Sequence, residues 1–134
     1  MTHDTLSLQG QRGTEVVRNN QYLGELGERM AARYLEMRGY RIIDRNWRHA
    51  RGELDLIASD GTTVVAVEVK TRRGSRFGHP FEAITREKAS RCRTLLNEWA
   101  LEHRGAYAAL RVDGVAIILN ENGRNTVEHL KAIG

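Results

Sequence analysis

The amino-acid sequence predicts an α/β fold in which a mixed central sheet is flanked by helices. Three features predict it: an amphipathic helical pattern near the N-terminus, three strand-like segments joined by short turns, and a second helical pattern followed by a further strand. Together they give the order α-β-β-β-α-β. The length of 134 residues fits one hydrophobic core. We expect residues 20–134 to form this single domain and residues 1–19, which show no periodicity, to form a flexible arm.

The first element is a helix over residues 20–38. Its apolar stripe recurs at three- and four-residue spacing and comprises Leu23, Gly27, Met30, Ala31, Tyr34 and Leu35. Gly39 follows as a helix stop.

Three strands come next. Residues 40–47, 53–58 and 63–71 are rich in alternating or β-branched apolar side chains. Between the last two, Asp60 and Gly61 predict a tight hairpin turn.

A second helix is expected over residues 85–104, with Thr85 as its N-cap. Its apolar face would contain Leu95, Leu96, Trp99 and Ala100. Residues 107–119 are expected to form a fourth strand, in which Gly114 indicates a bulge or a close approach. We expect a short strand over residues 127–133.

Composition excludes several classes of protein. No apolar stretch approaches the roughly 20 residues that cross a bilayer, and residues 1–20 lack the apolar run of a signal peptide, so we expect no membrane contact and a cytoplasmic location. Cys92 is the only cysteine, which rules out an intramolecular disulfide and fits a reducing cytosol. No histidine lies near Cys92 in the sequence, so we expect an inert thiol. The five histidines show no metal-ligand spacing, and we expect surface roles for His49 and His79.

The hairpin carries the most informative residues. If its turn is tight, Asp55 faces Ala66 and Glu53 faces Glu68. Residues two apart on a strand share a face, so four charged groups are expected on one face: Glu53, Asp55, Glu68 and Lys70. The opposite face would hold five apolar side chains: Leu54, Leu56, Val65, Val67 and Val69. A slip of one residue would separate Glu68 and Lys70 from the other two charges.

Such a cluster opposes stability, because opposed carboxylates repel and an unpaired charge on a buried central strand is costly. Conflicts of this kind tend to mark functional sites. A hard divalent cation, Mg²⁺ or Mn²⁺, resolves the conflict by accepting oxygens from Asp55 and Glu68, with Glu53 as an outer ligand. The cation would lower the pKa of a bound water, and Lys70 would stabilise developing charge or orient that water.

Structural explanations compete with this hypothesis. An isolated Glu-x-Lys pair is commonly a salt bridge along a strand, in which Lys70 only neutralises Glu68. The additional carboxylate of Asp55 on the paired strand favours the functional explanation. Glu53 is equally well explained as a solvated neighbour of Arg51.

Two further carboxylates need assignment. Glu28 lies at the edge of the first helix's apolar stripe, where Gly24 and Gly27 would permit the helix to approach the hairpin closely. A solvated position is the alternative for Glu28. For Asp113 we expect a structural partnership with a nearby arginine.

Basic residues surround the acidic hairpin. The formal net charge is +4, from 21 Lys and Arg against 17 Asp and Glu. The cations expected to contact nucleic acid are Arg48, Arg51, Arg72, Arg73, Arg76 and Lys88. A cationic rim around an acidic centre suits a polyanion that is held while a metal acts on it. A solvated basic surface is the alternative.

The chain resembles the bacterial YraN-type proteins in several linked motifs: GERMAARYL (27–35), GY (39–40), GELDLI (52–57), VEVKTR (67–72), RFG (76–78) and RVDGV (111–115). That family belongs with the PD-(D/E)XK nuclease superfamily, close to archaeal Holliday-junction resolvases, and the resemblance implies a restriction-endonuclease-like core. It also implies Asp55 as the superfamily aspartate, Glu68 and Lys70 as the (D/E)XK element, and Glu28 as the helix-one glutamate. Leu54 stands where the superfamily's name has proline.

Two functions stay open at this point. The first is a Mg²⁺- or Mn²⁺-dependent endonuclease that hydrolyses phosphodiester bonds in nucleic acid, with DNA favoured over RNA and branched DNA suggested by the resemblance. The second is a nucleic-acid-binding module that keeps the fold without the chemistry. A partner role in a DNA-processing complex is not separated from these by sequence. Symmetric cleavage of two strands would require a homodimer, for which the sequence shows no interface.

Overall fold

The computed structural model describes residues 3–8, 20–74, 76, 78–103 and 109–134. In chain order the elements are β1 (His3–Leu8), α1 (Asn20–Met37), β2 (Arg41–His49), β3 (Gly52–Ser59), β4 (Thr63–Arg73), the 3-10 helix η2 (Pro80–Ala83), α2 (Arg86–His103), β5 (Ala109–Leu119) and β6 (Asn125–Leu130).

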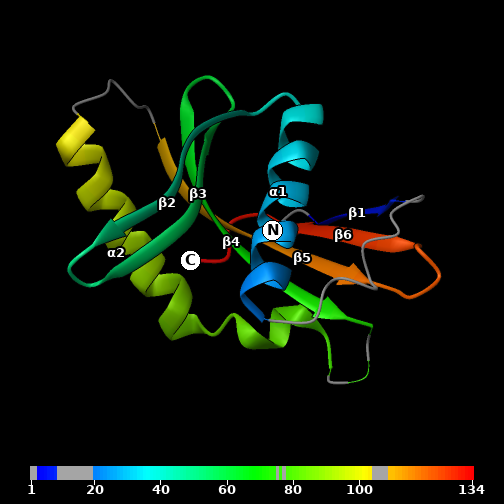
Figure 1. Cartoon of the computed structure of the whole chain (residues 1–134). Coiled ribbons are helices and arrows are strands. Elements are labelled where there is room, and N and C mark those ends of the chain that lie inside the picture. Colours follow the sequence, from blue (N-terminus) through cyan, green and yellow to red (C-terminus); the bar gives the residue numbers. More distant parts are fainter. Residues whose placement is uncertain (1–2, 9–19, 75, 77, 104–108) are drawn as a thin grey trace.

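One six-stranded sheet organises the molecule, with the strand order β1-β6-β5-β4-β3-β2. β4 and β5 are parallel and are connected through α2, whereas the other neighbouring strands are antiparallel. In Figure 1, α1 and α2 lie to either side of β4. The predicted mixed α/β fold is therefore confirmed, and it is consistent with a restriction-endonuclease-like core.

The sheet begins with a strand that the sequence did not predict. His3–Leu8 form β1 and pair with β6 in antiparallel register, from His3 opposite Leu130 to Leu8 opposite Asn125 (Figure 1). Six residues of the segment expected to be a flexible arm thus form a strand. Residues 9–19 of that segment lie outside the described residues.

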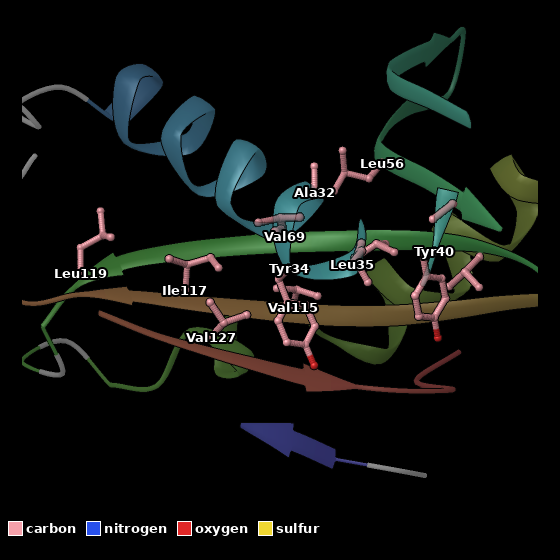
Figure 2. Close-up of a cluster of buried hydrophobic side chains, with 14 residues drawn as sticks. Ala32, Tyr34, Leu35, Tyr40, Leu56, Val69, Val115, Ile117, Leu119 and Val127 are labelled. Carbon is pink, nitrogen blue, oxygen red and sulfur yellow. The ribbon is translucent and has the colours of Figure 1, made fainter. Parts of the chain in front are cut away.

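The first helix forms where its apolar stripe predicts it. Ala32, Tyr34 and Leu35 are buried against the sheet, in one cluster with Val69, Val115 and Ile117 (Figure 2). The helix ends at Met37 and is followed by Gly39, whose φ of 91° suits glycine, and the Tyr40 amide donates to the Leu35 carbonyl at 3.0 Å.

Gly27 brings α1 close to β4. A Cβ atom at this position would overlap the side chain of Thr71 on β4. Gly24 meets nothing within 4 Å, so of the two glycines only Gly27 makes the predicted close approach. The contact fixes the next residue, Glu28, beside the strand that carries Glu68 and Lys70.

The second helix covers the opposite face of the sheet. Thr85 is its N-cap as predicted, because Thr85 Oγ1 accepts a hydrogen bond from the Lys88 amide at 3.1 Å. A second buried cluster joins α2 to β3, β4 and β5, and its members are Leu54, Ile57, Val64, Ala66, Cys92, Leu95, Leu96, Trp99 and Val112. Neither of the long helices in the described part of the chain combines the length and apolarity required to cross a bilayer.

The register of the β3–β4 hairpin differs from the predicted one by two residues. The last pair of the ladder is Ser59 with Val64, and the Asp60 amide donates to the Thr63 carbonyl at 3.2 Å, so the turn is tight but lies one residue later than expected, at residues 61–62. A shift of two residues preserves the faces of the strands. Continued one step beyond the observed ladder, this register brings Asp55, rather than Glu53, opposite Glu68.

The predicted faces hold on β4 but not along all of β3. Val65, Val67 and Val69 pack with α1 as a group, together with Leu56. Leu54 instead belongs to the cluster under α2, so its predicted place beside Leu56 was wrong. Leu54 and Leu56 would share a face on a regular strand, but here they lie on opposite faces of the sheet. We infer that β3 bends at Asp55, between them.

Candidate functional site

Asp55 lies where β3 separates from β4. The ladder between these strands ends at Leu56 opposite Val67, and one residue further Asp55 Oδ2 accepts a hydrogen bond from the Val69 amide at 2.9 Å. The Asp55 side chain thus accepts a hydrogen bond from a backbone amide of β4 that lies beyond the end of the β3–β4 ladder. Burial, followed by the nearby charge of Glu68, raises the pKa of Asp55 to about 7.

Glu68 is buried on the α2 side of β4, with 5% of its surface exposed. Its Oε1 lies 2.8 Å from Lys88 Nζ, and its Oε2 accepts a hydrogen bond from Cys92 Sγ at 3.5 Å. Both partners project from the first half of α2. The helix therefore orients the Glu68 carboxylate through two contacts.

Two lysines accompany the buried Glu68 and the half-buried Asp55. Burial, followed by the adjacent Lys88, lowers the pKa of Lys70. Burial alone would lower the pKa of Lys88, but the ion pair with Glu68 outweighs it and the pKa is raised. Lys88 was predicted to contact nucleic acid, whereas the structure places its ammonium group on Glu68.

Glu28 enters the site from α1. Burial, followed by the charge of Glu53, raises the pKa of Glu28. With its amide nitrogen turned toward the carboxylates, Asn46 donates to Glu28 Oε1 at 3.0 Å and to Glu53 Oε1 at 2.9 Å. Glu53 also pairs with Arg48, whose Nε lies 3.4 Å from Glu53 Oε2.

An open cavity of about 390 Å³ joins these groups. Its charged lining residues come from both helices and from β3 and β4, and they are Glu28, Asp55, Glu68, Lys70, Arg72 and Lys88. Asp55 and Glu68 thus line one cavity, together with Lys70 and Glu28. Glu53 is not among the described residues that line it.

The predicted nucleic-acid contacts are distributed around this cavity. Arg72 lines it, and Arg73 and Arg76 line a neighbouring cavity of about 520 Å³ beyond the ends of β4 and β5. Arg48 and Arg51 are on the exposed side of the β2–β3 hairpin. The arginines therefore flank the acidic centre.

The remaining candidates have structural roles. Asp113 is fully buried and accepts hydrogen bonds from Arg111, which confirms the predicted arginine partnership. Asp113 Oδ2 also lies 2.8 Å from Nε2 of His129. This histidine is buried, and the sequence analysis did not assign it a role. Cys92 is buried, and burial, followed by Glu68, raises the pKa of its thiol to about 12, which confirms an inert thiol.

The sequence analysis missed Asn46, and it assigned Lys88 to nucleic acid rather than to Glu68. Each had a local signal. Asparagine is disfavoured inside strands, yet Asn46 stands in the middle of β2. Lysine is disfavoured in the first turn of a helix, yet Lys88 lies three residues after the N-cap of α2.

The donor set fits a hard divalent cation. Asp55 and Glu68 supply carboxylate oxygens to one cavity. Burial, followed by repulsion from Glu68, raises the pKa of Asp55, and a cation would relieve that repulsion. Within the described residues, no three His, Cys, Asp or Glu side chains are gathered closely enough to hold a metal unaided. Mg²⁺ commonly uses one or two carboxylates and completes its shell with water and phosphate.

The sheet, its two helices and the carboxylate-lined cavity define a mixed α/β protein with a restriction-endonuclease-like arrangement. The chain belongs to the uncharacterised protein family UPF0102, whose family model matches residues 27–117. The predicted resemblance to YraN-type proteins is thereby confirmed.

Relatives cover most of the chain. A UPF0102 protein from Renibacterium salmoninarum is 49% identical over 112 residues, which are 84% of this chain and 95% of the relative. One from Beutenbergia cavernae is 48% identical over 112 residues, with the same coverage. One from an Arthrobacter species is 44% identical over 118 residues, 88% of this chain and all of the relative.

Proposed function

We propose that this protein is a metal-dependent endonuclease that hydrolyses phosphodiester bonds in nucleic acid, with DNA favoured over RNA. One observation carries this function: the buried carboxylate of Glu68 and the half-buried carboxylate of Asp55 line one cavity, which Lys70 also lines. Two carboxylates that repel each other, one buried and one half-buried, oppose folding, and a bound divalent cation would offset that cost. The arginines beside the cavity supply the cationic surface that a polyanion requires.

Each side chain has a defined task in this proposal. Asp55 and Glu68 hold Mg²⁺ or Mn²⁺, which would polarise a phosphoryl oxygen and lower the pKa of a water molecule. Lys70 orients the attacking water or stabilises the charge that develops on the phosphoryl group. Glu28 forms the α1 wall of the cavity, and Arg72 at its rim binds a phosphate of the substrate backbone.

A non-catalytic nucleic-acid-binding module is the second candidate, and the Lys88–Glu68 ion pair favours it. At 2.8 Å this ammonium group already neutralises Glu68. Lys70 and Lys88 together balance Asp55 and Glu68, so the cluster is compatible with a protein that binds no cation.

A cleavage screen separates the two candidates. Single-stranded, duplex, flap and four-way DNA, with matched RNA, are incubated with Mg²⁺, Mn²⁺ or a chelator. We expect metal-dependent cleavage of at least one DNA substrate. Salt-sensitive binding to these substrates, with no cleavage and no effect of divalent metal, would instead identify the binding module.

Metal affinity should depend on pH through Asp55. Its pKa is about 7, so below that pH the carboxyl group is mostly protonated and must lose its proton before it can bind a cation. We expect Mn²⁺ affinity to fall about tenfold per pH unit below about pH 6 and to level off above about pH 8. Calorimetric titration at a series of pH values measures this. An affinity that stays constant from pH 5.5 to 8.5 would contradict it.

A further inference from the structure

Asn46 combines an unusual backbone with an unusual side-chain contact. Its φ is +50°, and Ala132 is the only other non-glycine residue with positive φ in the described chain. Asparagine tolerates this left-handed region better than most residues, but the conformation still has a cost. Strain of this kind persists where the surrounding structure enforces it, and it is frequent at functional sites.

Asn46 lies directly across from the bend in β3. In the β2–β3 ladder, Arg45 pairs with Leu56 and Trp47 pairs with Leu54, so Asn46 stands across from Asp55. No pair joins Asn46 and Asp55 in that ladder. The left-handed residue and the bend therefore coincide at the point where β3 leaves β4 and Asp55 reaches the Val69 amide.

The Asn46 side chain joins two elements that carry like charge. Its amide donates to Glu28 Oε1 on α1 and to Glu53 Oε1 on β3. These carboxylates would otherwise repel each other. Because the amide uses one oxygen of each carboxylate, Glu28 is anchored while it remains part of the cavity wall.

We propose that Asn46 is a positioning residue of the active site, which sets the Glu28 carboxylate through its amide from the position on β2 that stands across from Asp55. This role rests on the proposed nuclease function and deepens it. Only asparagine supplies both properties: glycine allows the positive φ without the amide, and aspartate replaces the donor by a third negative charge.

The first test uses the metal-free protein. Asn46→Gly, Glu28→Ala and the double variant form a double-mutant cycle, followed by denaturant unfolding. Relief of backbone strain by glycine occurs with and without Glu28, so it cancels in the cycle. We expect Asn46→Gly to raise the unfolding equilibrium constant by a factor that is about tenfold larger when Glu28 is present than in the Glu28→Ala background. Additive effects of the two substitutions would overturn the proposed bridge.

The second test measures Mn²⁺ binding and DNA cleavage, with Asn122→Gly on the β5–β6 turn as the matched control. We expect Asn46→Gly to weaken Mn²⁺ affinity or kcat by about 10- to 100-fold, the usual effect of losing an outer residue that positions a side chain of the site. The KM for DNA should stay within about twofold of the wild-type value. The midpoint of thermal unfolding should stay within a few degrees of wild type. Asn46→Asp should be at least as impaired, although it keeps the shape of the side chain.

The two ideas fail in different ways. Wild-type protein that neither binds Mn²⁺ nor cleaves any substrate would overturn the proposed function itself. Wild-type protein that is active, with Asn46→Gly equally active and equally tight for Mn²⁺, would overturn only the role of Asn46.

Discussion

Asp55→Asn should abolish metal-dependent cleavage while it leaves the protein folded. Asparagine retains an oxygen that can accept the Val69 amide, so the local backbone contact survives. The charge that attracts a divalent cation is lost. Because such a cation contributes several kcal/mol to the transition state, we expect the cleavage rate to fall at least about 100-fold. Mn²⁺ binding, measured by calorimetry, should fall below detection.

The same substitution should stabilise the metal-free protein above pH 7. Burial raises the pKa of Asp55 to about 7, above its usual value of 3.8. The folded state therefore binds more protons than the unfolded state between these values, and stability falls as pH rises through this window. Asparagine has no such charge to bury, so Asp55→Asn should unfold at a higher temperature than wild type at pH 8. This difference in unfolding temperature between the variant and wild type should disappear near pH 4.

Asp60→Asn supplies the matched control for Asp55→Asn. Asp60 is exposed in the β3–β4 turn, where its Oδ1 accepts the Thr63 amide, a contact that asparagine can keep. This control should match wild type in cleavage and in Mn²⁺ affinity. Full Mn²⁺ binding and cleavage by Asp55→Asn would refute the metal site. Glu68→Gln gives an independent reading if Asp55→Asn unfolds.

Local patterns predicted the elements, because the cues lie within each element. Three of these cues are short-range: the apolar stripe of α1, the glycine after it and the Thr85 cap. The structure contains both helices and the cap where these cues predict them. β1 was missed because its strand depends on pairing with β6, more than a hundred residues further along the chain. Such pairing leaves little trace in the sequence of β1 itself.

The site was predictable only as far as strand alternation reaches. Glu68 and Lys70 share a face of β4 whatever the turn length, and a register shift of an even number of residues keeps the same side chains of β3 on that face. The bend at Asp55 broke the alternation on β3 and moved Glu53 toward Asn46 and Glu28. Lys88 could not be placed, because the rotation of α2 over the sheet decides whether it faces solvent or Glu68.

The RVDGV segment, one of the motifs shared with YraN-type proteins, should matter for folding rather than for chemistry. Asp113 lies on β5, fully buried on the α1 side of the sheet. Arg111 Nε and Nη2 donate to its two oxygens at 2.8 and 2.9 Å, His129 Nε2 lies 2.8 Å from Oδ2, and the Ala132 amide donates to Oδ1 at 2.9 Å. One carboxylate thus joins β5, β6 and the segment after β6.

Asp113→Ala should therefore lower the free energy of unfolding by roughly 3–5 kcal/mol, because it leaves Arg111 and His129 without their buried partner. For a chain of this size that corresponds to a fall of roughly 10–20 °C in Tm, which thermal unfolding at pH 7 would measure. Burial alone would raise the pKa of Asp113, but hydrogen bonds from His129 and Arg111 outweigh it and the pKa is lowered. The contribution is thus present above the unfolded-state pKa and disappears as pH falls through the folded-state value, so the variant and wild type should converge in acid. Below its lowered Tm the variant should still bind Mn²⁺ as wild type does, and a selective loss of metal binding in a fully folded variant would instead assign Asp113 to the site.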